Sequence, residues 1–370
     1  MNFLTAKLRV KLSKVLWITL MWMLVAVLES LYIHTLAIGF TPFQANEFYD
    51  FWELLKIQVI TATLAGFILG TLLIFVLRGR FRDRSFLEAV FLNTAILTAI
   101  LFVAIGIGIF VYEGNTHIFA FLHKNASNQL LHFYSNPFFL KTLIFWLIII
   151  FLTNFLLDVN EKYGAGVLRQ LVMGKYHHPR EEERIFMFLD MKGSTGIAEQ
   201  IGHIQFFELL NDFFKDITDP ILYTRGSIYQ YIGDEVIIVW KIPNGVKNSN
   251  CIRCFYNIRA AINLKSAEYK AKYGVVPDFK AGIHCGKVTI GEIGVLKRDI
   301  VFSGDVLNTT SRIQSLCNDF GVRLLISKRL LDKVGLPPNR LDTRKIGDIS
   351  LKGKKKKVVL YTIEEEQTRV

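Results

Sequence analysis

The sequence predicts a helical membrane domain with four transmembrane helices, followed by an α/β domain built as an α+β sandwich. Four long apolar stretches precede residue 160, each near the ~20 residues that a bilayer core requires: roughly 15–40, 54–77, 86–112 and 138–157. After residue 160, strand-like and helix-like patterns alternate with an ordinary content of charge. The length of 370 residues agrees with two or three domains of ~150 residues each.

Four segments follow from this division of the chain. They are an N-terminal tail (1–14), the membrane domain (15–158), a linker (159–182) and the C-terminal domain (183–366). The linker contains glycines at 164, 166 and 174 and a proline at 179, which break a short amphipathic piece. Either it couples the two domains or it is a passive spacer, and the sequence leaves both interpretations open.

The distribution of basic residues predicts how the membrane helices are oriented. Lys and Arg gather in the N-terminal tail and in the loop after the second apolar stretch: Lys7, Arg9, Lys11, Lys14, Arg78, Arg80, Arg82 and Arg84. The loop 41–53 has no basic residue, and 114–137 has only Lys124. Because cytoplasmic loops carry the excess of Lys and Arg, both termini are expected in the cytosol, beneath the plasma membrane. A cleavable signal peptide is not expected, since the first apolar stretch is too long and lacks a small-residue cleavage site.

The net charge of +12 does not indicate nucleic-acid binding. Much of the excess lies in the membrane flanks and in 352–357, where anionic lipid headgroups and a triphosphate explain it better. No helix-turn-helix pattern or aromatic-basic interleaving is present. The four cysteines lie on the predicted cytosolic side and are expected to be reduced. Cys251 and Cys254 fall within a helical pattern, which favours packing over a zinc half-site.

The elements of the C-terminal domain follow from hydrophobic period and turn residues. An apolar run predicts a buried strand at 185–190, which passes through Gly193 into helices at 195–223. Gly233 and Asp234 predict a tight turn in a hairpin at 227–240. The remaining pattern predicts a helix at 246–273, strands at 279–293, a helix at 306–320, a strand at 323–326 and closing strands at 341–363. An antiparallel-rich sheet is expected.

Two carboxylates at the ends of apolar runs are the strongest chemical signal. Asp190 ends the strand Ile-Phe-Met-Phe-Leu-Asp, and Asp234 lies in the hairpin turn of Tyr-Ile-Gly-Asp-Glu. If the two strands are neighbours in one sheet, both carboxylates lie at the same end, where like charges repel unless cations neutralise them. Hard oxygen ligands with added phosphate favour Mg²⁺ or Mn²⁺. The backbone N–H groups after Gly193, at Ser194 and Thr195, are free to hold that phosphate.

From about 183 to 363 the chain resembles the catalytic domain of class III nucleotidyl cyclases. The motifs that carry the resemblance agree in order and spacing: Phe-Leu-Asp190, Tyr-Ile-Gly-Asp234-Glu, Ala281-Gly-Ile-His-Cys-Gly286 with Gly291-Glu-Ile-Gly294, Ser303-Gly-Asp-Val-Leu-Asn308-Thr-Thr-Ser-Arg312 and Leu351-Lys-Gly-Lys354. The resemblance implies the split βαβ, ferredoxin-like palm fold and the cyclisation of a nucleoside triphosphate.

The resemblance also implies a role for each site residue. Asp190 and Asp234, with the Met191 carbonyl, would hold two divalent ions, Mg²⁺ or Mn²⁺. Asn308 would orient the ribose, and Arg312, four residues later, would stabilise charge on the α-phosphate.

A lysine of the Leu351–Lys354 turn, either Lys352 or Lys354, would contact the triphosphate tail. In this family the metal carboxylates and the Asn/Arg helix come from different subunits. With one cyclase domain per chain, the resemblance implies a head-to-tail homodimer with two equivalent sites.

The positions that choose the base match neither family pattern. Adenylyl enzymes typically have Lys with Asp or Thr, and guanylyl enzymes have Glu with Cys or a similar residue. This chain has Gln230 and, without a gap, Val301; Asp299 reaches the second position only if that segment bulges. ATP is favoured because no Glu is present to accept from the N1 and N2 donors of guanine. A guanylate cyclase, or a silent cyclase-like module for nucleotide sensing or dimerisation, stays open as an alternative.

Two polar residues fall inside the first apolar stretch. Glu29 and His34 are costly at that depth, so they indicate either a ligand, proton or cofactor pocket or an interhelical hydrogen bond, which we favour. His117, His123 and His132 in the outer loop have a spacing that does not argue for a metal site. Four spans with short loops suggest an anchor and sensor, and the sequence names no stimulus.

Overall fold

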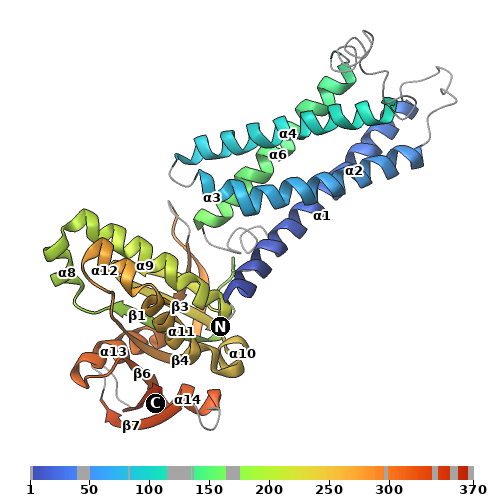
Figure 1. The fold of residues 1–370 in the computed structure, drawn as a ribbon. Coiled ribbons are helices and arrows are strands. Elements are labelled where there is room, and N and C mark those ends of the chain that lie inside the picture. The colour runs from blue at the N-terminus through green and yellow to red at the C-terminus, as the bar shows by residue number, and fades with distance from the viewer. Residues whose placement is uncertain are drawn as a thin grey trace. The chain divides into compact units, whose positions relative to one another are not determined.

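The computed structural model describes residues 3–39, 51–81, 84–114, 135, 137–163, 176–295, 299–335, 341–350 and 357–365. The chain forms two compact units, one of Leu8–Val172 and one of Met173–Val370 with Met1–Lys7. Figure 1 shows the first unit as long helices and the second as a sheet with helices on it. Among the predicted residues, Lys352, Lys354 and the three outer-loop histidines lie outside the described ranges.

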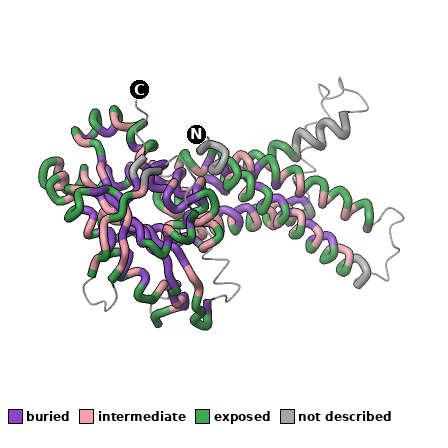
Figure 2. The backbone as a smooth tube through the Cα atoms, turned by 90° about the horizontal axis from the view of Figure 1, so that it is seen from below, coloured by how far each residue is buried: buried purple, intermediate pink, exposed green. Residues whose placement is uncertain are grey.

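The first unit consists of long apolar helices. They are α1 (Phe3–Gly39), α2 (Phe51–Leu72) continued by the π-helical turn η1 (Leu73–Leu77) and α3 (Arg78–Arg80), α4 (Phe86–Gly114) and α6 (Pro137–Tyr163). Four described segments are long and apolar enough to cross a membrane: Leu8–Leu36, Phe51–Arg80, Phe86–Ala104 and Phe139–Glu161. Large apolar side chains such as Trp17, Leu24 and Phe67 are exposed on these helices. The burial colouring of the backbone shows many exposed positions along the long helices (Figure 2). This exposure is what a lipid-facing surface requires.

Polar contacts join the helices inside this unit. The Trp22 indole N–H donates to Thr153 Oγ1 at 3.0 Å, and its ring lies 5.5 Å from that of Trp146. Glu29 is buried and forms an ion pair with Lys141 of α6, with 3.7 Å between Oε1 and Nζ. The expected interhelical contact of Glu29 is therefore present, while His34 packs its ring 4.3 Å from that of Phe51.

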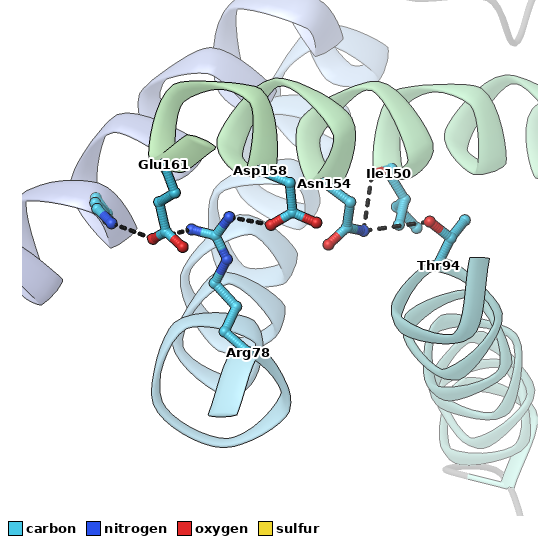
Figure 3. A network of polar contacts seen from close by, with 7 residues as sticks. Arg78, Thr94, Ile150, Asn154, Asp158 and Glu161 are labelled. Atoms are coloured by element: carbon cyan, nitrogen blue, oxygen red, sulfur yellow. Dashed lines mark hydrogen bonds and ion pairs between the residues drawn. The ribbon is translucent and has the colours of Figure 1, made fainter. Parts of the chain in front are cut away.

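A network of ion pairs and amide hydrogen bonds surrounds the last turns of α6 (Figure 3). Glu161 Oε1 accepts from Lys14 Nζ of α1 at 2.5 Å and from Arg78 Nη1 at 2.7 Å. The Arg78 guanidinium also pairs with Asp158. One helical turn earlier, Asn154 Nδ2 donates to Thr94 Oγ1 of α4 at 3.3 Å. The four long apolar helices, with α3 taken as the continuation of α2, thus all contribute to polar contacts around this end of α6.

The second unit is built on one eight-stranded sheet, within the described ranges. Its strands are β1 (Arg180–Met191), β2 (Ser227–Ile232), β3 (Glu235–Lys241), β4 (Phe279–Ile293), β5 (Asp299–Ser303), β6 (Leu324–Ser327), β7 (Leu341–Ile349) and β8 (Val358–Glu365). The order is β2-β3-β1-β4-β6-β8-β7, and β5 pairs with β4 off this path. The pairing of β4 with β6 is parallel, and the other pairings are antiparallel.

Helices cover both faces of the sheet. They are α8 (Ser194–Ile201), α9 (His203–Tyr223), α10 (Ile242–Val246), α11 (Asn250–Leu264), α12 (Ser266–Tyr273), α13 (Asp305–Asp319) and α14 (Lys328–Val334). Successive residues of a strand point to opposite faces. Met187 of β1 is buried with Phe213 of α9 and Phe255 of α11, whereas its neighbour Phe188 is buried with Val306 of α13 on the other face.

The observed elements differ from the predicted ones at several places. β1 begins five residues early, at Arg180, because its charged start pairs with residues 287–290 of β4. The helix expected at 246–273 is divided into the 3-10 turn η3 (Lys247–Ser249), α11 and α12, with Lys265 in a non-helical conformation between the last two. The strands expected at 279–293 are one strand, β4. β5 and α14 were not predicted.

Candidate active site

The two predicted carboxylates lie at neighbouring strand ends. β1 and β3 pair directly, with Asp190 opposite Glu235, and Asp234 precedes Glu235 in the β2–β3 turn. Gly233 permits this turn because it adopts a φ of 62°, which other residues rarely adopt. The condition set by the sequence, that the two strands be neighbours in one sheet, is therefore met.

Asp190 is the middle member of a row of three charged residues across the sheet. Its cross-strand partners are Glu235 on β3 and Lys280 on β4. Residues that are paired across antiparallel strands project from the same face. Lys280 Nζ lies 3.4 Å from Asp190 Oδ2, and Gln314 Nε2 of α13 donates to the same oxygen at 2.9 Å. The row thus places one lysine and two carboxylates side by side, beneath α13.

Burial and mutual repulsion perturb these acids. Burial raises the pKa of Asp190, and the nearby charge of Asp234 raises it further. The pKa of Glu235 is raised to about 7 by burial and by the charges of Asp190 and Asp234. The charged forms of these carboxylates are therefore destabilised here, and a bound cation would stabilise them.

The donor set fits a divalent cation of the Mg²⁺ type. In the described part of the chain, no three His, Cys, Asp or Glu side chains form a ready-made metal cage. Mg²⁺ sites commonly use one or two carboxylates and complete the shell with water and substrate phosphates. The candidate ligands in that arrangement are the carboxylates of Asp190 and Asp234 and the backbone carbonyl of Met191, the last residue of β1.

The segment after β1 has the conformation expected of a phosphate loop. Gly193 adopts a φ of 66° and precedes α8, which begins at Ser194 and contains Thr195. The Lys192 backbone N–H donates to the Asp278 carbonyl at 2.8 Å and fixes the start of the loop. No side chain caps the N-terminus of α8. Its first backbone N–H groups therefore follow directly on the end of the strand that carries Asp190.

Helix α13 carries site residues on two different faces. Asn308 is exposed and Arg312 is half-buried, whereas Gln314 is buried at 6% exposure. Asn308 and Arg312 lie four residues apart on one face, while Gln314 is turned about 200° from Arg312. Arg312 forms no ion pair with any residue that the structure describes. Within one chain, therefore, the Asn308/Arg312 face is not the face that contacts Asp190.

The two base-choosing positions lie on strands that do not pair with each other, since β2 pairs with β3 and β5 pairs with β4. Gln230 is exposed on β2, and Val301 is half-buried on β5. The Tyr229 and Phe302 rings, one residue away from each, are 4.7 Å apart, and the Phe302 N–H donates to the Tyr229 hydroxyl at 3.3 Å. β5 pairs with β4 without a bulge, with Val301 opposite Gly291, so Asp299 does not take the place of Val301.

Sequence reasoning missed Lys280 and Gln314 and gave no role to Glu235. A lysine inside the apolar run 279–283 was a signal for a buried partner. Gln314 follows Val306 and Thr310 at the spacing of the buried face of α13, where a polar side chain needs a hydrogen-bond partner.

Comparison with known proteins agrees with this fold. A family model described as the adenylate and guanylate cyclase catalytic domain matches residues 177–365. Adenylate cyclase 2 of Rhizobium meliloti strain 1021 is 36% identical over 209 residues, which is 56% of this chain and 57% of that protein. An adenylate cyclase of Anabaena cylindrica is 26% identical over 186 residues, 48% of this chain and 36% of that protein.

A solved structure of a bacterial light-regulated adenylyl cyclase shares the fold. Its TM-score is 0.53 at 18% identity, over 64% of this chain and 68% of that one. This chain spans less than two thirds of the length of both curated relatives. Because the family model covers just over half of its residues, this chain belongs to the class III adenylate and guanylate cyclase family.

Proposed function

We propose that this protein is a membrane-anchored adenylate cyclase that converts ATP to cyclic AMP and pyrophosphate. The observation that carries the proposal is the meeting of Asp190 and Asp234 at adjoining ends of β1 and the β2–β3 turn, in a chain that retains Asn308 and Arg312. The two curated relatives that bear the name adenylate cyclase support the choice of product.

Asp190, Asp234 and the Met191 carbonyl would hold two divalent ions, Mg²⁺ or Mn²⁺. Such ions lower the pKa of the attacking hydroxyl and neutralise the phosphates. The raised pKa values of Asp190 and Glu235 support this assignment, because burial and the neighbouring acidic charges both disfavour a carboxylate there without a cation.

The other site residues would bind and orient the nucleotide. In the reaction the ribose 3′-oxygen loses its proton and bonds to the α-phosphorus, and the bond from that phosphorus to pyrophosphate breaks. Backbone N–H groups of Gly193, Ser194 and Thr195 would hold phosphate oxygens. Asn308 would orient the ribose, and the Arg312 guanidinium would stabilise the charge that develops on the α-phosphate. Lys352 or Lys354 would bind the triphosphate tail.

The working form would be a head-to-tail homodimer. In each chain Asn308 and Arg312 lie on another face of α13 than the buried Gln314 that contacts Asp190. In one chain the cation half-site (Asp190 and Asp234) and the nucleotide half-site (Asn308 and Arg312) thus lie in different directions. A partner chain is needed to bring its Asn308 and Arg312 to the carboxylates of the first, and the reverse. Two equivalent sites result.

ATP is the favoured substrate because Gln230 offers an amide and no Glu stands beside Val301 to accept from guanine. The four apolar helices would anchor the enzyme in the plasma membrane. The excess of basic residues at Arg78, Arg80 and Arg84 supports a cytosolic catalytic domain, where ATP is available.

The test is to incubate the purified full-length protein with ATP and, separately, with GTP, each with Mn²⁺, and to identify the cyclic product. Cyclic AMP from ATP, lost in Asp234→Ala with the dimer intact, is the expected result. Product from GTP alone selects a guanylate cyclase. No product from either nucleotide identifies a silent nucleotide-sensing or dimerisation module and overturns the proposal.

A further inference from the structure

One oxygen of Asp190 is already occupied by two donors from its own chain. Gln314 Nε2 donates to Oδ2 at 2.9 Å, and Lys280 Nζ lies 3.4 Å from the same atom. Oδ1 accepts no hydrogen bond from the residues that the structure describes. The carboxylate is thus held by one oxygen, and the other is left to bind a ligand.

Both donors are themselves fixed by burial. Gln314 is 6% exposed and Lys280 is 9% exposed. Lys280 is paired with Asp190 in the β1–β4 register, so its position follows from the sheet. The absence of a side chain at Gly282 of β4 lets α13 pack closely against the strand at Gln314, because a Cβ there would be 2.4 Å from the Gln314 backbone nitrogen. A side chain with so little freedom can orient another one.

We propose that Gln314 is a positioning residue for the cation site, which with Lys280 holds Oδ2 of Asp190 and so directs Oδ1 toward the cation. This inference rests on the proposed function, because it presupposes that Asp190 binds a divalent ion. Partners of ligating carboxylates orient them, and their loss typically lowers metal affinity by ~10–100-fold.

The same contact connects the two half-sites of one chain. Gln314 follows Arg312 by two residues on α13, so the helix that positions the cation ligand also carries Asn308 and Arg312. Binding of a cation at Asp190 would therefore also favour one position of α13, through the Gln314 hydrogen bond. In a head-to-tail dimer this helix serves the other active site, and occupancy of one site would favour an ordered Arg312 in the second.

The experiment measures Mn²⁺ binding to the detergent-purified full-length protein by the electron paramagnetic resonance signal of free Mn²⁺. Gln314→Leu keeps the bulk of the side chain and removes the amide. Thr310→Val is the matched control, because Thr310 is also buried on α13 but its hydroxyl donates to the Val306 carbonyl and not to Asp190. Gln314→Leu is expected to weaken Mn²⁺ binding about ten-fold, and Thr310→Val to leave it unchanged.

A second readout separates positioning from general damage. If Gln314 acts through Asp190, excess Mn²⁺ should restore the turnover of Gln314→Leu, so that the half-saturating Mn²⁺ concentration rises while kcat recovers. Equal Mn²⁺ affinity of Gln314→Leu and wild type, in a protein whose binding is lost in Asp234→Ala, overturns this inference alone. Equal affinity of wild type and Asp234→Ala overturns the proposed cation site as well.

Discussion

Replacement of Gly282 by Ala should displace helix α13 and reveal how closely the site depends on it. The added Cβ would lie 2.4 Å from the Gln314 nitrogen and 2.8 Å from its Cα, both backbone atoms that cannot rotate away. Ordinary contact begins near 3.4 Å, so α13 must retreat by about 1 Å. The hydrogen bond from Gln314 to Asp190, now 2.9 Å, would be stretched beyond ~3.5 Å and lost.

The expected magnitudes follow from this displacement. Overpacking of a core costs ~1–3 kcal/mol, which corresponds to a fall in melting temperature of roughly 2–10 °C for a unit of this size. A misplacement of about 1 Å in catalytic groups lowers turnover by about 10²-fold. Circular dichroism melting, Mn²⁺ titration and cyclic nucleotide production measure the three effects.

The matched control is Gly196→Ala in α8, where an added Cβ meets no heavy atom within 4 Å. Its melting temperature should equal or exceed that of the wild type, because Ala is favoured over Gly in a helix. If Gly282→Ala melts like the wild type and keeps its Mn²⁺ affinity and turnover, the close packing of α13 on β4 does not govern the site, and the reasoning above is refuted.

Three further predictions concern the dimer, the pH dependence of stability and the membrane unit. Co-expression of Asp234→Ala with Arg312→Ala chains should recover roughly a quarter of wild-type activity, since half of the dimers are mixed and each mixed dimer has one intact site; no recovery would contradict the head-to-tail arrangement. The hydrogen bond from Lys333 holds the pKa of Glu183 below its ordinary value of 4.5, so this pair stabilises the fold above that pH and less as the pH falls through the lowered pKa. Glu183→Gln should therefore lower the melting temperature by roughly 1–3 °C at pH 7 and have a smaller effect as the pH falls below 4.5, and an equal effect at neutral and acidic pH would exclude this origin. Arg78→Met leaves two carboxylates of α6 without their shared guanidinium and should lower the melting temperature in detergent by roughly 5 °C or more; an unchanged value would show that the network adds no stability.

The sequence predicted the features that depend on local pattern. Asp190 and Asp234 could be placed at one edge of a sheet because each follows a short apolar run with its own turn signal. β5 was not predicted because Asp299–Ser303 is short and begins with a charged residue. It therefore has too few alternations of apolar and polar residues to show the period of a strand. α14 is only seven residues long, below the length at which a helical period becomes clear.

The contacts of Asp190 could not be read from local pattern. Lys280 meets Asp190 only through the register of β1 with β4, which joins residues ninety positions apart. Gln314 reaches Asp190 only because α13 packs closely against β4, a contact that depends on tertiary packing. The base-choosing pair could be named from the resemblance, but the packing of Tyr229 on Phe302 that brings β2 and β5 together depends on the folded sheet.

The ion pairs at the end of α6 constrain how that helix can move within the helical unit. Glu161 is bound by both Lys14 and Arg78, and Arg78 also binds Asp158 one turn away. Rotation of α6 by a single residue, about 100°, or a slide of one residue, about 1.5 Å, would take both acids out of register with their partners. The last turn of α6 is therefore expected to keep its register with α1 and α3, so that a rearrangement of the bundle would carry all of these helix ends together.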